Sequence, residues 1–159
     1  HSRFFWGLRL HLLCTLHGIP VGFALAGAKA DERQTLLGIF EADPELPAWR
    51  TGQVVITDKN YYGREFEAEL AAADLDLLRP ARKGEKPRPG TRFFKPLRQV
   101  IESVNDTFKG QLDLEQHGGH TPAGVWVRVV QRVLALTAAI WHNDRTGQPI
   151  KRSLIAYDH

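Results

Sequence analysis

A carboxylate follows directly after an apolar run in the first half of the chain. Residues 54–57 read VVIT, a pattern typical of a short strand that is buried on both faces, and Asp58 comes next in VVITDKNYYG. In an open α/β sheet, ligands gather at the carboxyl ends of the strands. A carboxylate there can cap the turn, bind a metal ion or act as a general base. For a lone aspartate the structural role is the commoner one, so Asp58 needs a partner before any chemistry is assigned to it.

A second group of charged residues lies in the segment 96–115, which reads as a helix with Pro96 in its first turn. Arg98, Glu102 and Lys109 follow at steps of four and seven residues, and such steps keep side chains on one face of a helix. The plain interpretation is a solvated stripe with an i,i+4 Arg–Glu pair, which stabilises a helix by about 0.2–0.5 kcal/mol. Taken alone, the spacing favours this interpretation.

The elements that must position these groups are expected to alternate along the chain. Residues 4–28 read as a β-hairpin with a turn at HGIP (17–20), and Asp31 is expected to cap the helix that follows. The segment DPELPAW (43–49) is expected to be a loop. This order predicts a mixed α/β sheet covered by helices. The other expected elements are helices at 31–42, 64–74, 96–115 and 123–143, the last of them mostly buried, and strands at 53–57 and 75–81.

The bulk composition restricts the class of protein. The chain has 159 residues, of which 43% are hydrophobic, and a formal net charge of +3. This suits one domain with a real core, and the mild basic excess fits a polyanionic partner without requiring one. The single cysteine, Cys14, excludes an internal disulfide framework. The sequence contains no apolar run of 18 residues, so no membrane span is expected.

A basic segment, RPARKGEKPRPGTR (79–92), is expected to be a mobile loop because it is rich in proline and glycine. Its cations could neutralise DNA phosphates, which gives affinity without sequence information. The alternative, a loop that is merely solvated, is weighted equally. The basic residues are Arg79, Arg82, Lys83, Lys86, Arg88 and Arg92, against the single acid Glu85.

Several aromatic residues are expected to have structural roles. Trp6, Trp126 and Trp141 are assigned to the core. Tyr61 and Tyr62 follow the strand-end aspartate, where one of them could line a DNA site or simply pack.

A zinc site is not expected at His11, Cys14 and His17, because a strand places the two histidines on one side and the cysteine on the other.

In this order and spacing, the segments resemble bacterial insertion-sequence transposases of the DDE (Asp-Asp-Glu) type. ITDKNYYG resembles the motif around the family's second aspartate. Arg98, Glu102 and Lys109 match its C-terminal signature of Arg, catalytic Glu and Lys. FFWGLRLHLLCTLHGIPVGFALAGAKADER is similar to the family's hairpin, and WHN and IKRSLIAYDH are similar to its closing segment. The resemblance covers essentially the whole chain.

The resemblance implies a ribonuclease H-like fold and DNA transposition by metal-dependent phosphodiester cleavage and strand transfer. It implies that three carboxylates hold two Mg²⁺ ions, for which Mn²⁺ can substitute, and that Asp58 and Glu102 are two of the three. Their carboxylates are then expected about 4–7 Å apart, because each Mg–O bond is about 2.1 Å. Arg98 and Lys109 would contact DNA phosphates or balance the carboxylate charge. The basic residues added to the DNA-binding set are Lys83, Lys86, Arg88 and Arg92.

The implied partners are the DNA of transposon ends and targets, with self-association on DNA, in the bacterial cytoplasm near the nucleoid and without a membrane. Two features depart from the family pattern. The usual tyrosine three residues before the arginine is Lys95, and the first aspartate has no counterpart, because Asp31 matches a different position. Residues 1–143 are therefore expected to be a catalytic domain truncated before its N-terminal strand, with a tail at 144–159, and inactive alone.

Two alternatives remain open. A non-catalytic, basic DNA-binding remnant of a mobile element would share all of these residues. An unrelated basic α/β domain that binds RNA or protein would instead keep Asp58 and Glu102 far apart. The distance between the two carboxylates separates this last alternative from the transposase interpretation.

Overall fold

The computed structural model of the chain describes residues 7–49, 52–149 and 154. Its elements are those of a mixed α/β protein, as expected, and they form two compact units that are described one at a time. The first unit contains residues 1–12 and 22–95, and the second contains 13–21 and 96–159. The expected core position of Trp6 lies outside the described residues, as does most of the motif IKRSLIAYDH.

The chain begins with the expected hairpin. Strand β1 (Leu8–Cys14) pairs with β2 (Pro20–Gly27). The five residues between them are too few for a parallel crossover, so the pair is antiparallel. The turn is closed by a hydrogen bond of 2.9 Å from the Thr15 N–H to the Ile19 carbonyl, and Gly18 supplies the positive φ of 89° that it needs.

Helix α1 (Glu32–Ala42) in the first unit begins where the sequence predicts. The Asp31 carboxylate accepts hydrogen bonds from the backbone N–H groups of Arg33 and Gln34, at 2.8 and 3.3 Å, and so caps the helix. The expected loop that follows is wrong in part, because α2 (Glu45–Ala48) forms one helical turn there. Pro44 precedes this turn with φ −66°, a backbone value already suited to a helix start.

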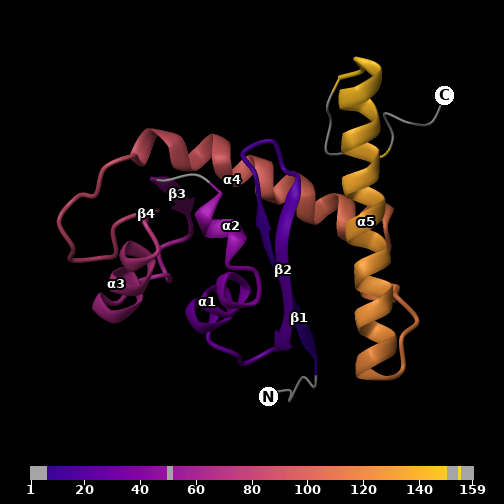
Figure 1. Ribbon diagram of the computed structural model, residues 1–159, viewed down its shortest axis with the longest axis horizontal. Helices are drawn as coiled ribbons and strands as arrows, with labels where there is room; N and C mark the ends of the chain where they lie inside the picture. The colour runs from indigo at the N-terminus through magenta and orange to yellow at the C-terminus, as the bar shows by residue number, and fades with distance from the viewer. Residues whose placement is uncertain (1–6, 50–51, 150–153, 155–159) are drawn as a thin grey trace. The chain divides into compact units, whose positions relative to one another are not determined.

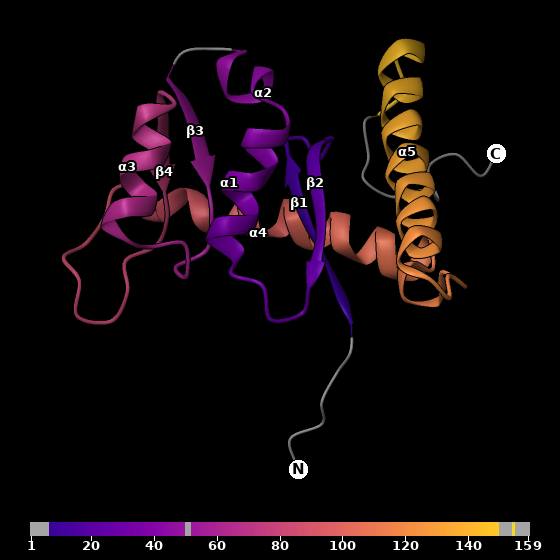
Figure 2. The ribbon, with the colours of Figure 1, turned by 60° about the horizontal axis from the view of Figure 1, so that its bottom comes forward.

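A β–α–β unit forms the rest of the first unit's framework. Strands β3 (Gln53–Ile56) and β4 (Leu75–Leu78) pair in parallel, and the crossover helix α3 (Arg64–Ala72) packs on β4 (Figures 1 and 2). Leu70 and Leu75 are 1% and 4% exposed. The expectation that β3 is buried on both faces is wrong, since Val55 is buried but its neighbour Val54 is 52% exposed. Successive strand residues face opposite sides, and only one side is covered here.

The second unit is mainly helical and also contains the turn end of the hairpin. Helix α4 (Thr91–Asp106) continues into a π-helical turn, η1 (Thr107–Gln111), and a 3₁₀ turn, η2 (Leu114–Gln116), precedes the long helix α5 (Pro122–Thr146). The first five residues of α4 belong to the first unit. The helix therefore starts earlier than expected, and Pro96 lies inside it instead of in its first turn. The Thr121 hydroxyl caps α5 by accepting the Gly124 N–H at 3.0 Å.

The core of the second unit contains side chains from η1, α4 and α5. Phe108 and Val104 are 1% and 0% exposed, and Leu136 and Ile140 of α5 are each 1% exposed. The Arg132 side chain of α5 donates to the Leu112 carbonyl at 2.6 Å and to the Asp113 carbonyl at 3.3 Å. These bonds satisfy carbonyls at the end of η1, which the helix itself cannot pair.

Helix α5 is less buried than its apolar sequence suggests. Its inward stripe is Val129, Val133, Leu136 and Ile140, at steps of four, three and four residues. The predicted core positions of Trp126 and Trp141 are wrong, because their side chains are 44% and 59% exposed. Within the described part of the chain, α5 is the helix that is long and apolar enough to cross a membrane. One such helix is weak evidence of a membrane span, since the core helix of a soluble protein can match the same criteria.

Candidate functional site at the carboxyl edge of β3 and β4

Asp58 lies where the sequence predicts, just beyond the carboxyl end of β3. The ladder extends by one bond, from the Thr57 N–H to the Leu78 carbonyl at 3.0 Å, and the chain then turns away. The Asp58 Oδ1 atom accepts the Asn60 N–H at 2.6 Å, so this carboxylate does shape the turn. The side chain is nevertheless exposed, which leaves it accessible to a cation.

Glu102 lies on α4 in the second unit. Arg98 Nε donates to Glu102 Oε1 at 2.7 Å, which confirms the expected i,i+4 ion pair on an exposed helix face. Lys109 does not follow Arg98 and Glu102 on one regular α-helix, as the spacing predicted. It lies in the π-helical turn, where i→i+5 bonds such as Leu112 N–H to Thr107 carbonyl (3.0 Å) reduce the rotation per residue. The Lys109 ammonium instead pairs with Glu115 at 3.2 Å.

The two candidate carboxylates belong to different units, Asp58 to the first and Glu102 to the second. Their expected separation of about 4–7 Å therefore stays a prediction. Within the described ranges, no three metal-ligating side chains form a cluster. Asp31 is already engaged, since its carboxylate caps α1 and pairs with Arg33 at 2.5 Å. This ion pair and the helix N–H groups lower the pKa of Asp31 below its ordinary value.

The basic segment 79–92 is not the free loop that its composition suggests. The Arg79 side chain is 3% exposed, and its guanidinium contacts Glu67 of α3 at 3.1 Å and Glu85 at 2.8 Å. Arg88 also contacts Glu67, at 3.4 Å. A buried guanidinium must have acceptors, and these two glutamates supply them. The loop is therefore tied to α3, which corrects the prediction that it is mobile.

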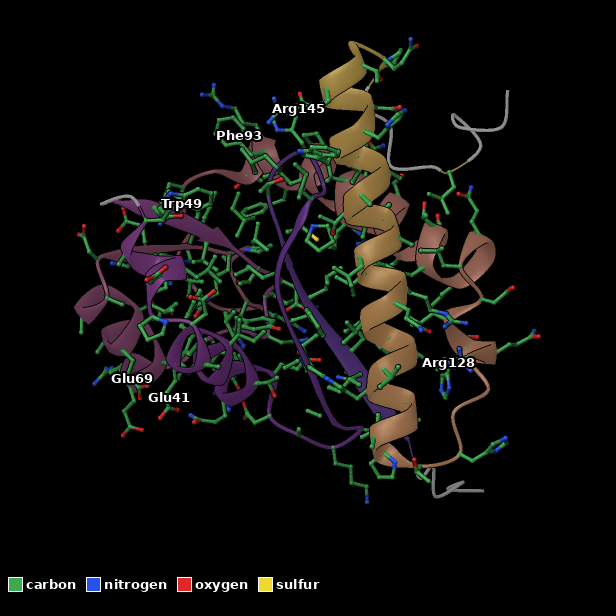
Figure 3. All side chains as sticks on the ribbon, turned by 45° about the vertical axis from the view of Figure 1, so that its right-hand side comes forward. Glu41, Trp49, Glu69, Phe93, Arg128 and Arg145 are labelled. Carbon is green, nitrogen blue, oxygen red and sulfur yellow. The ribbon has the colours of Figure 1, made fainter. Side chains whose placement is uncertain are left out.

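The loop cations that were assigned to DNA differ in their surroundings. Lys83 and Lys86 are exposed, whereas Arg88 is partly buried by its contact with Glu67. Arg92 belongs to α4 instead of the loop, and its guanidinium lies 4.8 Å from the ring centre of Phe93. Figure 3 labels Phe93, which projects from α4 and is 45% exposed. Binding of DNA by these four cations stays a prediction.

A pocket that the sequence did not reveal lies at this edge of the first unit. Its volume is about 300 Å³, and it lies between the start of α3 and the loop 79–92. Both strands end here, so Asp58 follows β3 and Arg79 follows β4 at one edge of the parallel pair. The sequence carried no local signal for this pocket, because Glu67 and Arg79 lie twelve residues apart on different elements. The residues that line the pocket are Tyr62, Gly63, Arg64, Glu67, Arg79, Glu85 and Arg88.

The two tyrosines after Asp58 have different roles. Tyr61 packs with Phe66 at a ring-centre separation of 6.1 Å. Burial, and secondarily the negative charges of Glu32 and Asp58, raise the pKa of Tyr61 to about 12. Tyr62 lines the pocket, and the Arg82 guanidinium lies 3.5 Å from its ring centre. Tyr61 is therefore a packing residue, whereas Tyr62 is available at the pocket.

The ion pairs of the loop predict a specific loss of stability in acid. The Arg79 guanidinium, with the Arg82 N–H, lowers the pKa of Glu85 from 4.5 to about 2. Because the folded-state pKa is depressed, this contribution is complete above pH 4.5 and is lost as the pH falls toward 2. Melting temperatures measured between pH 6 and pH 2.5 should therefore fall less for Glu85→Gln than for the unchanged protein. Glu69→Gln, which alters an exposed acid of α3, should follow the unchanged protein; equal curves for all three would contradict the role of Glu85.

Comparison with known proteins gives one match. A family model described as the Transposase DDE domain matches residues 1–138, which is most of the chain. No curated protein matches significantly, and no solved structure does. The matched region includes β3 with its strand-end aspartate and the helix that carries Arg98 and Glu102. The chain therefore belongs to the transposase DDE domain family, whose members act on DNA in transposition and recombination.

Proposed function

We propose that this chain forms the part of a bacterial DDE transposase that contributes the second aspartate and the glutamate of its catalytic site. The reaction is metal-dependent cleavage of DNA phosphodiesters followed by strand transfer, on a ribonuclease H-like framework, in the bacterial cytoplasm near the nucleoid. The observation that carries the proposal is the family match over residues 1–138, together with the place of Asp58 at the carboxyl end of β3.

The donor chemistry of the proposed site fits a hard divalent cation. Asp58 and Glu102 are both exposed carboxylates, and oxygen is the ligand atom that Mg²⁺ takes, with Mn²⁺ as a substitute. Two such ions, when bound, stabilise the attacking and leaving oxygens of an in-line displacement. Two carboxylates are fewer than this site needs, so a third acidic ligand has to come from elsewhere than Asp31, which already caps α1.

The remaining residues of the proposed site orient the Asp58 carboxylate and neutralise the negative charge of Glu102 and of DNA phosphates. The Asn60 N–H holds one Asp58 oxygen at 2.6 Å and so fixes the direction of the carboxylate. Arg98 is paired with Glu102, and in the complex with DNA it balances that carboxylate or contacts a phosphate. Lys109 and the loop cations add sequence-independent contacts to the phosphates of transposon ends and target, on which the protein self-associates.

A non-catalytic DNA-binding remnant is the second candidate. It is favoured by the hydrogen bond of 2.6 Å from the Asn60 N–H to Asp58, which gives this carboxylate a structural role without any metal. This candidate keeps the DNA contacts of the basic residues and gives Asp58 only the turn-capping role that its bond to Asn60 already shows. The two candidates make opposite predictions about DNA cleavage.

The experiment that tests the proposal measures cleavage and strand transfer on supercoiled DNA with Mg²⁺ or Mn²⁺. It uses the full-length protein that contains these residues, with Asp58→Asn and, as a matched control, Asp106→Asn, an exposed acid one turn beyond Glu102. We expect activity that is lost in Asp58→Asn and kept in Asp106→Asn. Binding of DNA without cleavage by the unchanged protein would support the remnant instead.

A further inference from the structure

The pocket at the carboxyl edge of β3 and β4 has an uneven distribution of charge and exposure. Three arginines and two glutamates line it, so its formal charge is +1. The arginines come from two segments: Arg64 begins α3, whereas Arg79 and Arg88 lie at the start and near the end of the loop 79–92. Because α3 and the loop both contribute, the charges of this pocket in the first unit do not come from a single run of sequence.

The three arginines differ in how far their donors are already used. Arg79 is saturated, because its Nε and both Nη atoms donate to Glu67, Glu85 and the Pro80 carbonyl at 2.8–3.3 Å. It serves as the buried anchor of the loop. Arg88 makes only long contacts with Glu67, at 3.4–3.5 Å. None of the ion pairs between residues that the structure describes includes Arg64, which is exposed. Arg64 and Arg88 therefore have N–H groups that are available to bind an external anion.

Glu67 occupies the place that such an anion would take. Its carboxylate is shared between Arg79 and Arg88, at 3.1 and 3.4 Å, and is about one third exposed. A phosphate offers more acceptor oxygens than a carboxylate and suits the planar fork of arginine. A phosphate at the pocket can therefore take over Arg88 from Glu67, while the Arg79–Glu85 pair keeps the loop in place.

We propose that this pocket binds a backbone phosphate of DNA through Arg64 and Arg88, and that Glu67 is an internal competitor for it. The proposal rests on the proposed function in one respect, that the ligand is DNA, and it needs neither metal nor catalysis. Tyr62 lines the pocket, and the Arg82 guanidinium lies 3.5 Å from its ring centre, so a further cation stands next to the proposed phosphate site. Glu67 thus weakens DNA binding, because the phosphate must first displace the Glu67 carboxylate from Arg88.

The test measures the affinity for a fluorescent DNA duplex by anisotropy, between 50 and 200 mM KCl, in EDTA and with full-length protein carrying Asp58→Asn. Because no cleavage is possible under these conditions, failure of the catalytic proposal does not affect the result. Arg64→Gln and Arg88→Gln should each reduce the salt slope by about 0.9 and weaken binding several-fold. Arg128→Gln, which removes an exposed charge of α5, is the matched control and should leave the slope unchanged.

The sign of the Glu67 effect is the sharper part of the test. Glu67→Gln should raise the affinity by at least about threefold, whereas Glu69→Gln, the same charge change two residues along α3, should raise it less than twofold. Equal effects of the two glutamine variants would overturn the role of Glu67. Unchanged slopes in Arg64→Gln and Arg88→Gln would overturn the pocket itself. If Glu67→Gln fails to fold, Arg64→Gln still decides, because that side chain supports no ion pair among the described residues.

Discussion

Replacing Asp58 with asparagine or Glu102 with glutamine is expected to weaken Mn²⁺ binding to the full-length protein by at least about a hundredfold. Even the partners that only orient a metal ligand cost about 10- to 100-fold in affinity when they are changed, and loss of a ligand costs more. An asparagine or glutamine amide keeps the shape of the side chain but removes the charge that attracts a divalent ion. Electron paramagnetic resonance of free and bound Mn²⁺ measures this without any DNA.

The matched control is Asp106→Asn, on the same helix as Glu102. Asp106 is exposed and its side chain caps no helix, so its replacement should change Mn²⁺ affinity by less than about twofold. Equal Mn²⁺ affinities of Asp58→Asn and Asp106→Asn would contradict the assignment of Asp58 as a metal ligand. A loss of Mn²⁺ affinity in only one of Asp58→Asn and Glu102→Gln would also contradict a shared site, because such a site requires both ligands.

Phe108→Ala is expected to destabilise the protein by about 3–5 kcal/mol. Phe108 lies in the π-helical turn and is 1% exposed, in the same core as Val104 and Leu136. Truncation removes a large apolar side chain and leaves a cavity that the neighbouring helices fill only in part. Urea denaturation followed by tryptophan fluorescence measures the loss, since Trp126 and Trp141 lie on α5 of the same unit.

Phe93→Ala provides the same chemical change at an exposed site. Phe93 is 45% exposed and contacts the Arg92 guanidinium at 4.8 Å, so its truncation should cost about 1 kcal/mol or less. A midpoint that shifts equally in the two variants would contradict the core position of Phe108. An unchanged midpoint in Phe108→Ala would do so more strongly.

Local patterns in the sequence predicted most of the elements, because their signals come from neighbouring residues. Asp31 caps α1 as expected, since an N-cap needs only the N–H groups two and three residues ahead. The β–α–β order likewise follows from alternating apolar runs. Burial that depends on contacts with distant segments was not predicted. The exposure of Trp126 and Trp141 depends on how many faces of α5 are covered, which periodicity alone does not give.

In the candidate site, too, the features set by neighbouring residues were predicted and those set by long-range contacts were not. The strand-end position of Asp58 and the Arg98–Glu102 pair could be predicted, because both are set by residues within four positions. The burial of Arg79 could not, since its partner Glu67 is twelve residues away and on another element. Composition therefore described the loop 79–92 as free and basic, although long-range ion pairs hold it against α3.

The most direct test of the shared metal site uses Fe²⁺ in place of Mg²⁺ and maps where the protein backbone is cut. With ascorbate and peroxide, a bound iron ion produces hydroxyl radicals that cleave the chain close to its ligands, and mass spectrometry locates the breaks. If both carboxylates hold the ion, cuts are expected near residue 58 and near residue 102, and both sets of cuts should be lost in Asp58→Asn and in Glu102→Gln. Cuts near one position only, or cuts at 102 that survive Asp58→Asn, would contradict the claim that the two carboxylates hold metal together.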